Sequence, residues 1–531
     1  MPPHFRQSMT WLHSWAGVLI GSLLFVVFWM GTLSVFDREI DRWMMPDTRL
    51  DTAVLQAPLV LDGPVGAQIE RLTQGASQWS VVLPYERAPV LRLSWRPPGS
   101  ALPERRYLHP RTGAVLNEAE TLGGSGFIYP FHYSLHLKWK DLGYWLAGLA
   151  GLAMLVGVVS GVVIHRKLLA DFFLFRPRKQ LPRASLDLHN LTGVLLLPFH
   201  FAIALSGLIV FMGIYWPAAP WAAYPGAGPV AAQRAFQAEG MGVYRRPPAG
   251  RPAGQAPKLD ALLAQARRHW PGSEAYFLRV WHPGDANSYV ELRRSPQDQV
   301  PLGLEQLYFD AASGTLLHEF NEAPVMRVQR FISGLHYVQF KHWTLRWLYF
   351  AAGLGGCVMI GTGFVFWLES RRVQHARQGL RGVRVVEALS IATLPGVIGA
   401  TLAFLIANRL LPAQAGFGGL GRAELEMAAF YLSWLLSLAH AAWRGRPAWA
   451  TQVGAVAIAA AAAVLLNALT TGMPLWRSLQ QGQWGVAGVD TALLCLAALS
   501  AWTASRLRRP APRRKAAGPA GAVPPSGERH A

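Results

Sequence analysis

The sequence predicts a membrane protein that is mainly an all-α helical bundle, with about eight transmembrane helices and two small α+β domains outside the membrane. The 531-residue chain is 52% hydrophobic and only 15% charged, whereas soluble proteins carry about 25% charged residues. Its apolar runs reach about 20 residues, the length that crosses a bilayer. A unit of helix, outer domain and helix also occurs twice in the same order. Together these observations favour a duplicated membrane bundle over a soluble enzyme.

Eight apolar runs are long enough to be spans. They cover residues 11–36, 142–164, 188–216, 345–368, 385–407, 427–443, 449–469 and 486–507. The first run is predicted to be an uncleaved anchor, because it is long, follows little positive charge and has no small-residue cleavage site before Asp37.

The spans and the segments between them divide the chain into seven parts. These are residues 1–36 (N-terminus and first span), 37–141 (first outer domain), 142–216 (spans two and three with a basic loop), 217–344 (second outer domain), 345–372 (span four), 373–507 (a membrane region of four helices) and 508–531 (a disordered basic tail).

Basic residues near the span ends predict the orientation, since loops rich in Lys and Arg stay in the cytoplasm. The loop between spans two and three holds Arg166, Lys167, Arg176, Arg178, Lys179 and Arg183 against a single acid, Asp171. Further basic residues follow spans four and six and end the chain, so both termini are predicted to be cytoplasmic. Much of the formal net charge of +20 belongs to these loops, so membrane lipid is the expected partner and nucleic acid is not.

Two long stretches, residues 37–140 and 217–341, face outward and alternate apolar with polar residues as half-buried strands do. The order helix, strand, strand, hairpin is predicted in both: residues 65–72, 79–83, 90–95 and 107–116 in the first stretch, and residues 259–270, 275–281, 288–292 and 308–317 in the second. Gly113 and Gly314 in the hairpins can take a positive φ. The stretches are therefore predicted to be repeats of one small domain.

Histidines at the ends of the first four spans form the candidate site, because a bilayer tolerates ionisable groups only where they have partners or a function. His13 and His189, the inner pair, begin spans one and three. His132 and His336, the outer pair, lie before spans two and four, each followed by Tyr. The repeat implies a pseudo-twofold axis along the membrane normal, across which equivalent histidines face one another.

The two facing pairs predict two b-type haems. Such a haem needs two neutral imidazoles from different helices, oriented by hydrogen bonds at their other ring nitrogens. Both pairs meet the first requirement, and Gly17 and Gly193, one helical turn after the inner histidines, let a flat macrocycle approach the backbone. At about 1.5 Å rise per residue, a span separates the pairs by roughly the membrane thickness, so two haems could relay an electron across.

Several other residues stay open as members of the site. Alternative ligands are His136, one turn after His132; His165, at the end of span two; His200, after Pro198; and His342, at the start of span four. Lys138, Lys140 and Lys341 could line the entry of an anionic substrate, and no catalytic residue is assigned. The chain has no dinucleotide-binding glycine motif after a strand and only short cytoplasmic loops, so the electron donor is predicted to be quinol or a separate cytoplasmic reductase.

These features resemble the PepSY-associated transmembrane proteins. The resemblance rests on the domain endings Thr112-Gly113 and Ser313-Gly314, on the His-aromatic entry to spans two and four, and on the Ser-Gly or Thr-Gly near their exits, and it covers about residues 9–372. That family includes iron-regulated inner-membrane proteins and haem-containing ferric-siderophore reductases. The resemblance implies two PepSY-like domains, a location in the bacterial inner membrane, and an enzyme that reduces a ferric siderophore in the periplasm and releases ferrous iron.

Two other functions fit the same features. An inner-membrane transporter of a siderophore or of iron would use the four additional spans, although few acids lie within the spans. A non-enzymatic regulatory or binding protein would use its PepSY domains to contact a protein or peptide, although histidines at matched depth disfavour it. The last four spans carry no recognisable motif.

Overall fold

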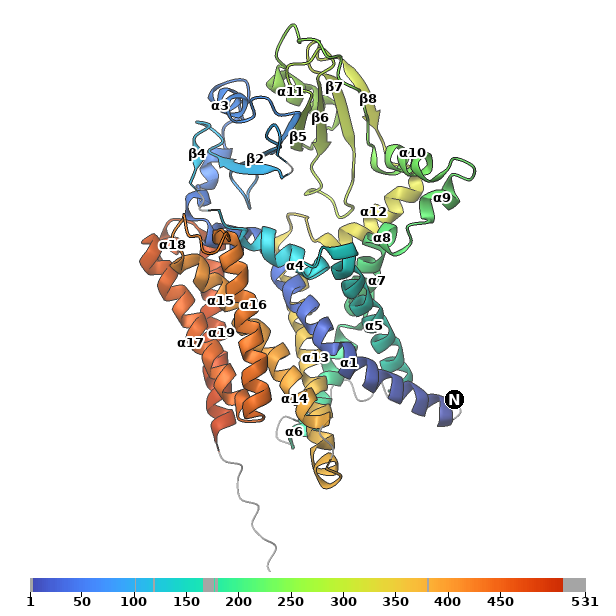
Figure 1. The fold of residues 1–531 in the computed structure, drawn as a ribbon, viewed down its shortest axis with the longest axis vertical. Helices are drawn as coiled ribbons and strands as arrows, with labels where there is room; N and C mark the ends of the chain where they lie inside the picture. Colours follow the sequence, from blue (N-terminus) through green and yellow to red (C-terminus); the bar gives the residue numbers. More distant parts are fainter. Residues whose placement is uncertain are drawn as a thin grey trace, which may run out of the picture.

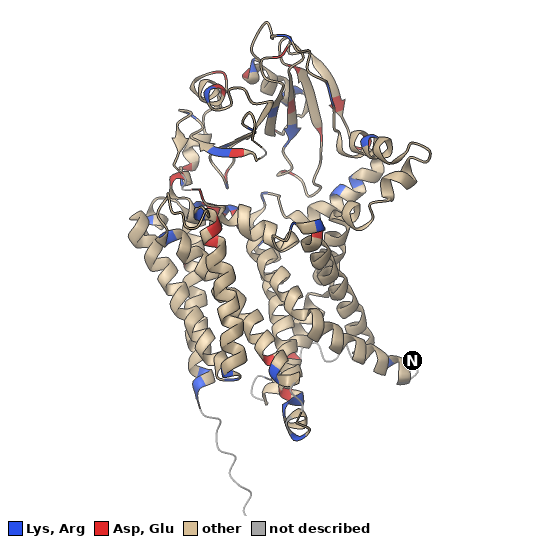
Figure 2. Cartoon of the chain, in the orientation of Figure 1, with Lys and Arg blue, Asp and Glu red and all other residues tan. Residues whose placement is uncertain are grey.

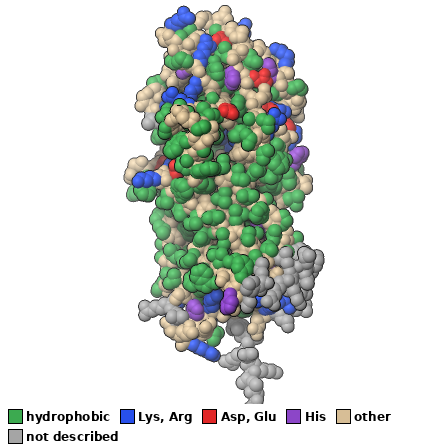
Figure 3. Space-filling view, turned by 90° about the vertical axis from the view of Figure 1, so that its right-hand side faces the viewer, with side chains coloured by type: hydrophobic (Ala, Val, Ile, Leu, Met, Phe, Trp, Pro, Cys, Tyr) green, Lys and Arg blue, Asp and Glu red, His purple; other side chains and the backbone are tan. Residues whose placement is uncertain are grey.

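The structure, a computed structural model, describes residues 3–100, 102–117, 120–165, 176, 180–379 and 382–509. A helical bundle carries a sheet domain at one end (Figure 1). Charged residues gather on the sheet domain and at both ends of the bundle, whereas the middle of the bundle has almost none (Figure 2). On the face that Figure 3 shows, hydrophobic side chains cover most of the surface between these ends. This distribution is that of a multi-pass membrane protein, as the sequence predicts.

Seven helical segments of the described chain are long and apolar enough to cross a membrane, and one bent pair is an eighth candidate. The seven are α1 (Pro3–Ser34), α5 (Leu142–Ile164), α13 (Trp343–Arg377), α14 with α15 (Gly382–Ile391 and Val397–Leu410), α16 (Arg422–Arg444), α17 (Ala448–Thr471) and α19 (Trp484–Arg508). Each predicted span falls on one of these elements or on the bent pair. Most of the predicted basic loop and of the predicted tail, residues 166–175, 177–179 and 510–531, lies outside the described residues.

The bent pair consists of α6 (Leu181–Leu195) and α7 (Leu197–Val210), which meet at 67°. Pro198 accounts for the break, because proline has no N–H to donate to the preceding turn and its ring disfavours helical backbone just before it. Leu196 between the two helices has non-helical angles, with φ −102° and ψ 13°. The first repeat has no such break, since α1 is a single helix.

The first four predicted spans pack as a repeated unit. α1 contacts α5 and the short α4 (Tyr129–Ser134), and in the second repeat α6 contacts α13 while α7 contacts α12 (Pro324–Tyr337). Contacts of α1 with α13 and of α5 with α7 join the two units. This arrangement agrees with the predicted pseudo-twofold relation.

The outer segments form one antiparallel sheet. Its strands are β1 (Gln78–Val82), β2 (Leu91–Trp95), β3 (Glu104–Leu108), β4 (Val115–Leu116), β5 (Ala275–Trp281), β6 (Tyr289–Arg294), β7 (Gln306–Asp310) and β8 (Leu316–Phe320), in the order β4-β3-β2-β1-β5-β6-β7-β8. β1 and β5 join the halves, with Val81 opposite Leu278. The two domains predicted from the sequence therefore share one sheet, although each contributes the strands expected of it.

One hydrophobic core supports this sheet. Helices α3 (Pro64–Leu72) and α11 (Leu259–His269) pack their buried residues onto the same sheet face, including Val65 of α3 and Leu262 of α11. A reciprocal contact joins the starts of these helices. The carboxylate of Asp62 accepts the backbone N–H groups of Leu259 and Asp260, and the carboxylate of Asp260 accepts those of Leu61 and Asp62, at 2.8–3.0 Å.

Helix α2 (Asp37–Met44), which the sequence does not predict, packs against the last four spans. Trp43 Nε1 donates to Asp490 of α19 at 2.7 Å, and Arg42 Nη2 donates to Gln483 at 2.5 Å. Just beyond α2, Arg49 donates to Asn467 of α17 at 2.9 Å. The C-terminal region therefore fixes α2 at the outer end of the bundle.

Short helices and turns complete the described fold. They are α8 (Met212–Tyr215), α9 (Ala219–Ala223), α10 (Pro229–Met241), α18 (Leu475–Gln480), the 3-10 turns η1 (Pro46–Thr48), η2 (Thr52–Leu55) and η4 (Trp139–Asp141), and the π turns η3 (Gly124–Ile128) and η5 (Ala392–Gly396).

The reciprocal aspartate contact gives a first prediction. Asp260→Ala removes two charge-assisted hydrogen bonds across the joint between the halves, so the sheet domain should lose about 1–2 kcal/mol of stability. The measurement is the temperature at which thermolysin begins to cut the sheet domain of the intact protein. Asp51→Ala is the matched control, because the Asp51 side chain accepts a hydrogen bond within its own turn, from the N–H of Ala53, and takes no part in the joint between the halves. Equal temperatures for both variants would contradict the predicted joint.

Candidate functional site

The four principal histidines lie in two layers of the repeated bundle. Residues of α1 in the first repeat correspond to residues of α6 and α7 in the second repeat that lie 176 positions later. The corresponding pairs are His13 and His189, Leu24 and His200, Val27 and Ile203, and Gly31 and Gly207. Residues of α5 and their counterparts on α13 are 202 positions apart: Met154 and Gly356, Gly157 and Met359, Ser160 and Thr362, Gly161 and Gly363. This correspondence predicts which contacts should recur around each histidine.

The inner pair lies near the start of α1 and within α6. His13 Nδ1 is 3.1 Å from the carbonyl oxygen of Gly157 and 3.1 Å from Ser160 Oγ. His189 Nδ1 is 2.8 Å from the carbonyl oxygen of Met359, the counterpart of Gly157. The two ring centres are 6.1 Å apart, with the ring planes at 86°. The structure therefore brings together the two histidines that the sequence pairs.

The outer pair lies on the short helices α4 and α12. His132 Nδ1 is 2.8 Å from the carbonyl oxygen of Val27, and His336 Nδ1 is 3.0 Å from that of Ile203. The ring centres are 5.8 Å apart and the planes are inclined by only 24°. Burial lowers the pKa of both imidazoles below the ordinary value, so these rings are neutral at physiological pH.

The hydrogen bonds determine which nitrogen each histidine can offer. A carbonyl oxygen can only accept, so in all four rings Nδ1 carries the proton and donates it. In a neutral imidazole the other nitrogen, Nε2, then has a free lone pair. A histidine that binds a metal usually donates its other ring N–H in this way to a carbonyl or carboxylate oxygen, which fixes the tautomer.

The spacing of the rings fits a metal ion between them. Metal–imidazole bonds are about 2 Å long, so two imidazoles on opposite sides of one metal have ring centres roughly 6 Å apart. Both pairs have this separation. Within the described ranges, no group of three or more His, Cys, Asp or Glu side chains is arranged to hold a metal ion. Two facing imidazoles supply two nitrogen donors, so a metal ion held by such a pair would take its remaining ligands from elsewhere.

Glycines make room for three of the four rings. A Cβ atom at Gly31 would lie 2.7 Å from the His132 ring, one at Gly207 would lie 2.8 Å from the His336 ring, and one at Gly363 would lie 3.2 Å from the His189 ring. Contacts under 3.0 Å force a neighbour to move, so alanine would displace the outer rings.

Each pair borders a cavity. The inner cavity has a volume of about 440 Å³ and is lined by His13, His189 and six glycines: Gly17, Gly21, Gly157, Gly161, Gly193 and Gly363. The outer cavity, about 130 Å³, is lined by His132, His336, Gly31 and Gly207. Gly17 and Gly193, which the sequence singles out as the approach for a macrocycle, thus line the larger space.

The two cavities are close to one another. Leu24 and Met154 line both, so a single layer of side chains lies between them on that side. Along α1, His13 precedes Val27, which anchors His132, by 14 residues, or roughly 21 Å at 1.5 Å per residue. The pairs therefore lie at different levels of one span, and their separation along α1 is shorter than the full membrane thickness that the sequence predicts.

The other candidates have different surroundings. His165 lines the inner cavity, and its buried Nδ1 has no hydrogen-bond partner among the described residues. His136 instead stacks on Phe127 and is bonded through Nε2 to that residue's carbonyl oxygen at 2.9 Å. His342 is exposed, as are Lys138, Lys140 and Lys341, and Lys341 forms an ion pair with Asp298. None of these five residues lines a cavity described above, and their predicted roles stay predictions.

His200 has an unusual environment for a buried histidine. It is fully buried, and neither ring nitrogen has a hydrogen-bond partner of normal geometry among the described residues. It takes the place that Leu24 has in the first repeat, beside Gly356, the counterpart of Met154. A Cβ atom at Gly356 would lie 3.1 Å from His200 Nε2, so the small residue accommodates the ring.

The environment of His200 predicts the effect of exchanging it for its repeat counterpart. His200→Leu should raise stability by about 1–2 kcal/mol, because a buried polar group without a partner destabilises the folded state by this order. The measurement is the midpoint of thermal unfolding of the purified protein. Leu24→His, the reciprocal change, should lower the midpoint, since Met154 fills the space there. A lower midpoint for His200→Leu would mean that His200 contacts a bound group.

Comparison with known proteins agrees with this architecture. A family model described as "PepSY-associated TM region" matches residues 10–370 of the chain. An uncharacterized protein of Pseudomonas aeruginosa is 31% identical over 291 residues, which cover 51% of this chain and 69% of that protein. The matched residues include both histidine pairs and the whole sheet domain.

Proposed function

The chain belongs to the family of PepSY-associated transmembrane proteins, and from that premise we propose that it is a haem-containing oxidoreductase of the bacterial inner membrane. It passes electrons from the cytoplasmic side to a ferric siderophore in the periplasm, and ferrous iron is released there. Quinol or a separate cytoplasmic reductase supplies the electrons. Both termini are cytoplasmic, because described basic residues gather at the end opposite the sheet domain (Figure 2).

The observation that supports this proposal most strongly is the state of the four histidines. In each facing pair, Nδ1 of both rings is bonded to a backbone carbonyl of a neighbouring helix, which leaves both Nε2 atoms available as ligands. His13 and His189 would hold one haem b, and His132 and His336 would hold the second. Bound in this way, haem iron supplies reversible one-electron transfer at a potential set by its ligands and their surroundings.

The protein's own residues perform the remaining tasks. The four carbonyl contacts hold the ligating rings in one orientation, and the apolar helices keep water away from the space between the pairs. On the outer side, each ferric ion takes up one electron and becomes ferrous. The chelator keeps its covalent structure. Release needs no cleavage, because Fe²⁺, with its lower charge, binds the hard oxygen donors of the chelator less tightly than Fe³⁺ does.

The first experiment measures the cofactor directly. The protein purified in detergent should contain about two b haems per chain in a pyridine haemochrome titration. His13→Ala, His132→Ala, His189→Ala and His336→Ala should each reduce this to about one, because one ligand pair is broken. His440→Ala is the control, since His440 lies on α16 and contacts Gln452. A colourless wild-type protein would exclude the proposed oxidoreductase.

Glycine substitutions test the same assignment without removing a ligand. Gly207→Ala should lower the haem content from about two to about one, because its Cβ atom displaces the His336 ring. Gly213→Ala adds the same methyl group six residues later, where its Cβ atom meets nothing within 4 Å, and should retain both haems. Equal haem content in the two variants would place the outer cofactor elsewhere.

The redox activity has its own test. Protein reduced with dithionite and freed of excess reductant should be reoxidised by a ferric siderophore. Ferrozine should then capture one ferrous ion for each haem that is reoxidised. The His336→Ala variant should lose this reaction, because the outer ligand pair is broken. Uptake of radioactive iron into vesicles without ferrous iron forming would favour a transporter instead.

A further inference from the structure

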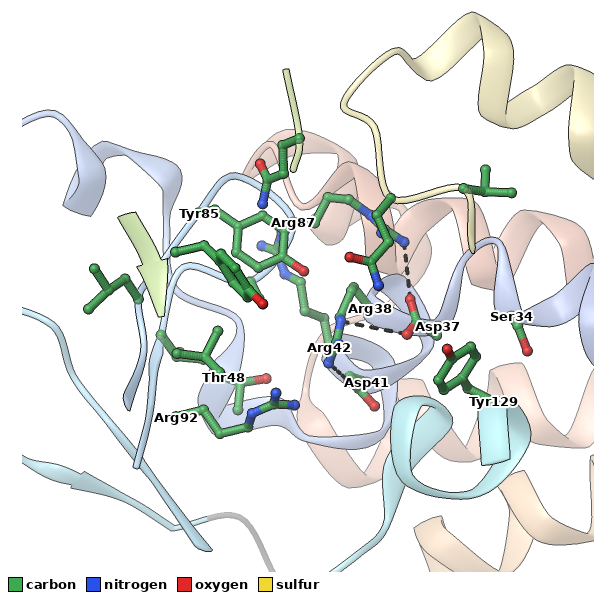
Figure 4. A pocket seen from close by; sticks show the side chains of 18 of the residues that line it. Ser34, Asp37, Arg38, Asp41, Arg42, Thr48, Tyr85, Arg87, Arg92 and Tyr129 are labelled. Carbon is green, nitrogen blue, oxygen red and sulfur yellow. Dashed lines mark hydrogen bonds and ion pairs between the residues drawn. The ribbon is translucent and has the colours of Figure 1, made fainter. Parts of the chain in front are cut away.

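A polar cavity of about 230 Å³ lies between the sheet domain and the membrane bundle. Its walls come from α2, from β2 and β3, and from the segment that follows α12. It shares Ser34, Tyr129, Tyr337 and Val338 with the small space that borders His132 and His336. The polar cavity therefore adjoins the outer pair, and Figure 4 shows the side chains that surround it.

Positive charge is in excess in the lining of this cavity. Five arginines line it with two aspartates: Arg38, Arg42, Arg87, Arg92 and Arg346, against Asp37 and Asp41. Both aspartates form ion pairs with Arg38, at 3.6 Å for Asp37 and 3.4 Å for Asp41. The local charge therefore favours an anion.

Most of the arginines are held by partners in the protein. Arg87 forms ion pairs with Glu39 at 2.6 Å and with Asp37 at 3.3 Å. Arg346 donates to the carbonyl oxygens of Phe340 and Val35 at 2.9 and 3.0 Å. Arg42 donates to Gln483, as described above, and to a carbonyl oxygen. These guanidinium groups form the structural wall of the cavity.

Arg92 differs from the others. Its backbone belongs to the ladder between β1 and β3. Its side chain makes no hydrogen bond or ion pair with any residue in the described part of the chain, and no dashed line reaches it in Figure 4. Its neighbours on β2, Leu91 and Leu93, are buried in the core of the sheet. Since side chains alternate along a strand, Arg92 projects from the opposite face, toward the membrane bundle.

Tyrosines supply the other groups that a small ligand would contact. Five of them line the cavity: Tyr85, Tyr107, Tyr129, Tyr276 and Tyr337. Phenol groups donate hydrogen bonds to oxygen anions, and their rings stack on flat ligands. We propose that this cavity binds a compact anionic metal chelate with carboxylate or phenolate oxygens, and that Arg92 provides its main charged contact. The electron acceptor role of that chelate rests on the proposed function, whereas its binding does not.

Gallium(III) citrate tests binding separately from reduction, because gallium(III) replaces iron(III) in such complexes and is not reduced by the protein. Titration calorimetry on the full-length protein in detergent should give saturable binding. Arg92→Gln should weaken it about tenfold or more, as expected for loss of a charged hydrogen bond. Arg92→Lys should restore part of the affinity, which a merely structural role would not predict.

Arg106→Gln is the matched control. Arg106 lies on β3 opposite Leu93, so it projects from the other face of the sheet, and it is exposed. Its removal changes the net charge equally and should leave the affinity unchanged. The cationic gallium complex of desferrioxamine B should bind at least tenfold more weakly than gallium citrate. Thermal unfolding of each variant confirms that it is folded.

Each result decides the inference. No binding of gallium citrate to the wild type, equal affinity in Arg92→Gln, or equal affinity for the cationic complex would overturn it. Binding that depends on Arg92 in a protein without haem would support the site while the proposed function fails. Two haems without such binding would support the proposed function and overturn the site.

Discussion

The hydrogen bond between a histidine ring and a backbone carbonyl of the neighbouring helix is the contact on which this bundle depends. A carbonyl oxygen has two lone pairs, so Val27 and Ile203 can accept from their own helix and from an imidazole as well. The ring must then lie against the backbone of that helix, which is possible beside Gly31 and Gly207. The tautomer, the glycine positions and the close packing of α1 with α4 and of α7 with α12 are thus consequences of one requirement.

The two repeats are most alike where they hold the histidines and differ between these levels. Carbonyl contacts recur at corresponding positions in both repeats, although one repeat has a straight helix and the other is bent at Pro198. Between the pairs, Leu24 and Met154 of the first repeat correspond to His200 and Gly356 of the second. Leu and Met together are much larger than His and Gly, so at this level the second repeat has less side-chain volume as well as a more polar group.

Local patterns in the sequence predict much of this structure. The spans, the strands and the pairing of His13 with His189 follow from apolar length, alternation and the internal repeat. Joining β1 to β5 could not be predicted, because both are half-buried strands and no local signal distinguishes pairing within a repeat from pairing across it. The role of α2 depends on Asp490 and Gln483, more than 400 residues away in a region without motifs. Arg92 is an ordinary polar strand residue until the tertiary structure places the membrane bundle opposite it.

The connection between β8 and α12 has a mechanical consequence. β8 ends at Phe320 and α12 begins at Pro324, so three residues join the sheet to the helix that carries His336. Such a short connector has no slack, and the single sheet links both halves of the outer domain. Any tilt of that domain therefore displaces the helix that carries His336, whereas His13 and His189 lie on α1 and α6, which no strand adjoins along the chain.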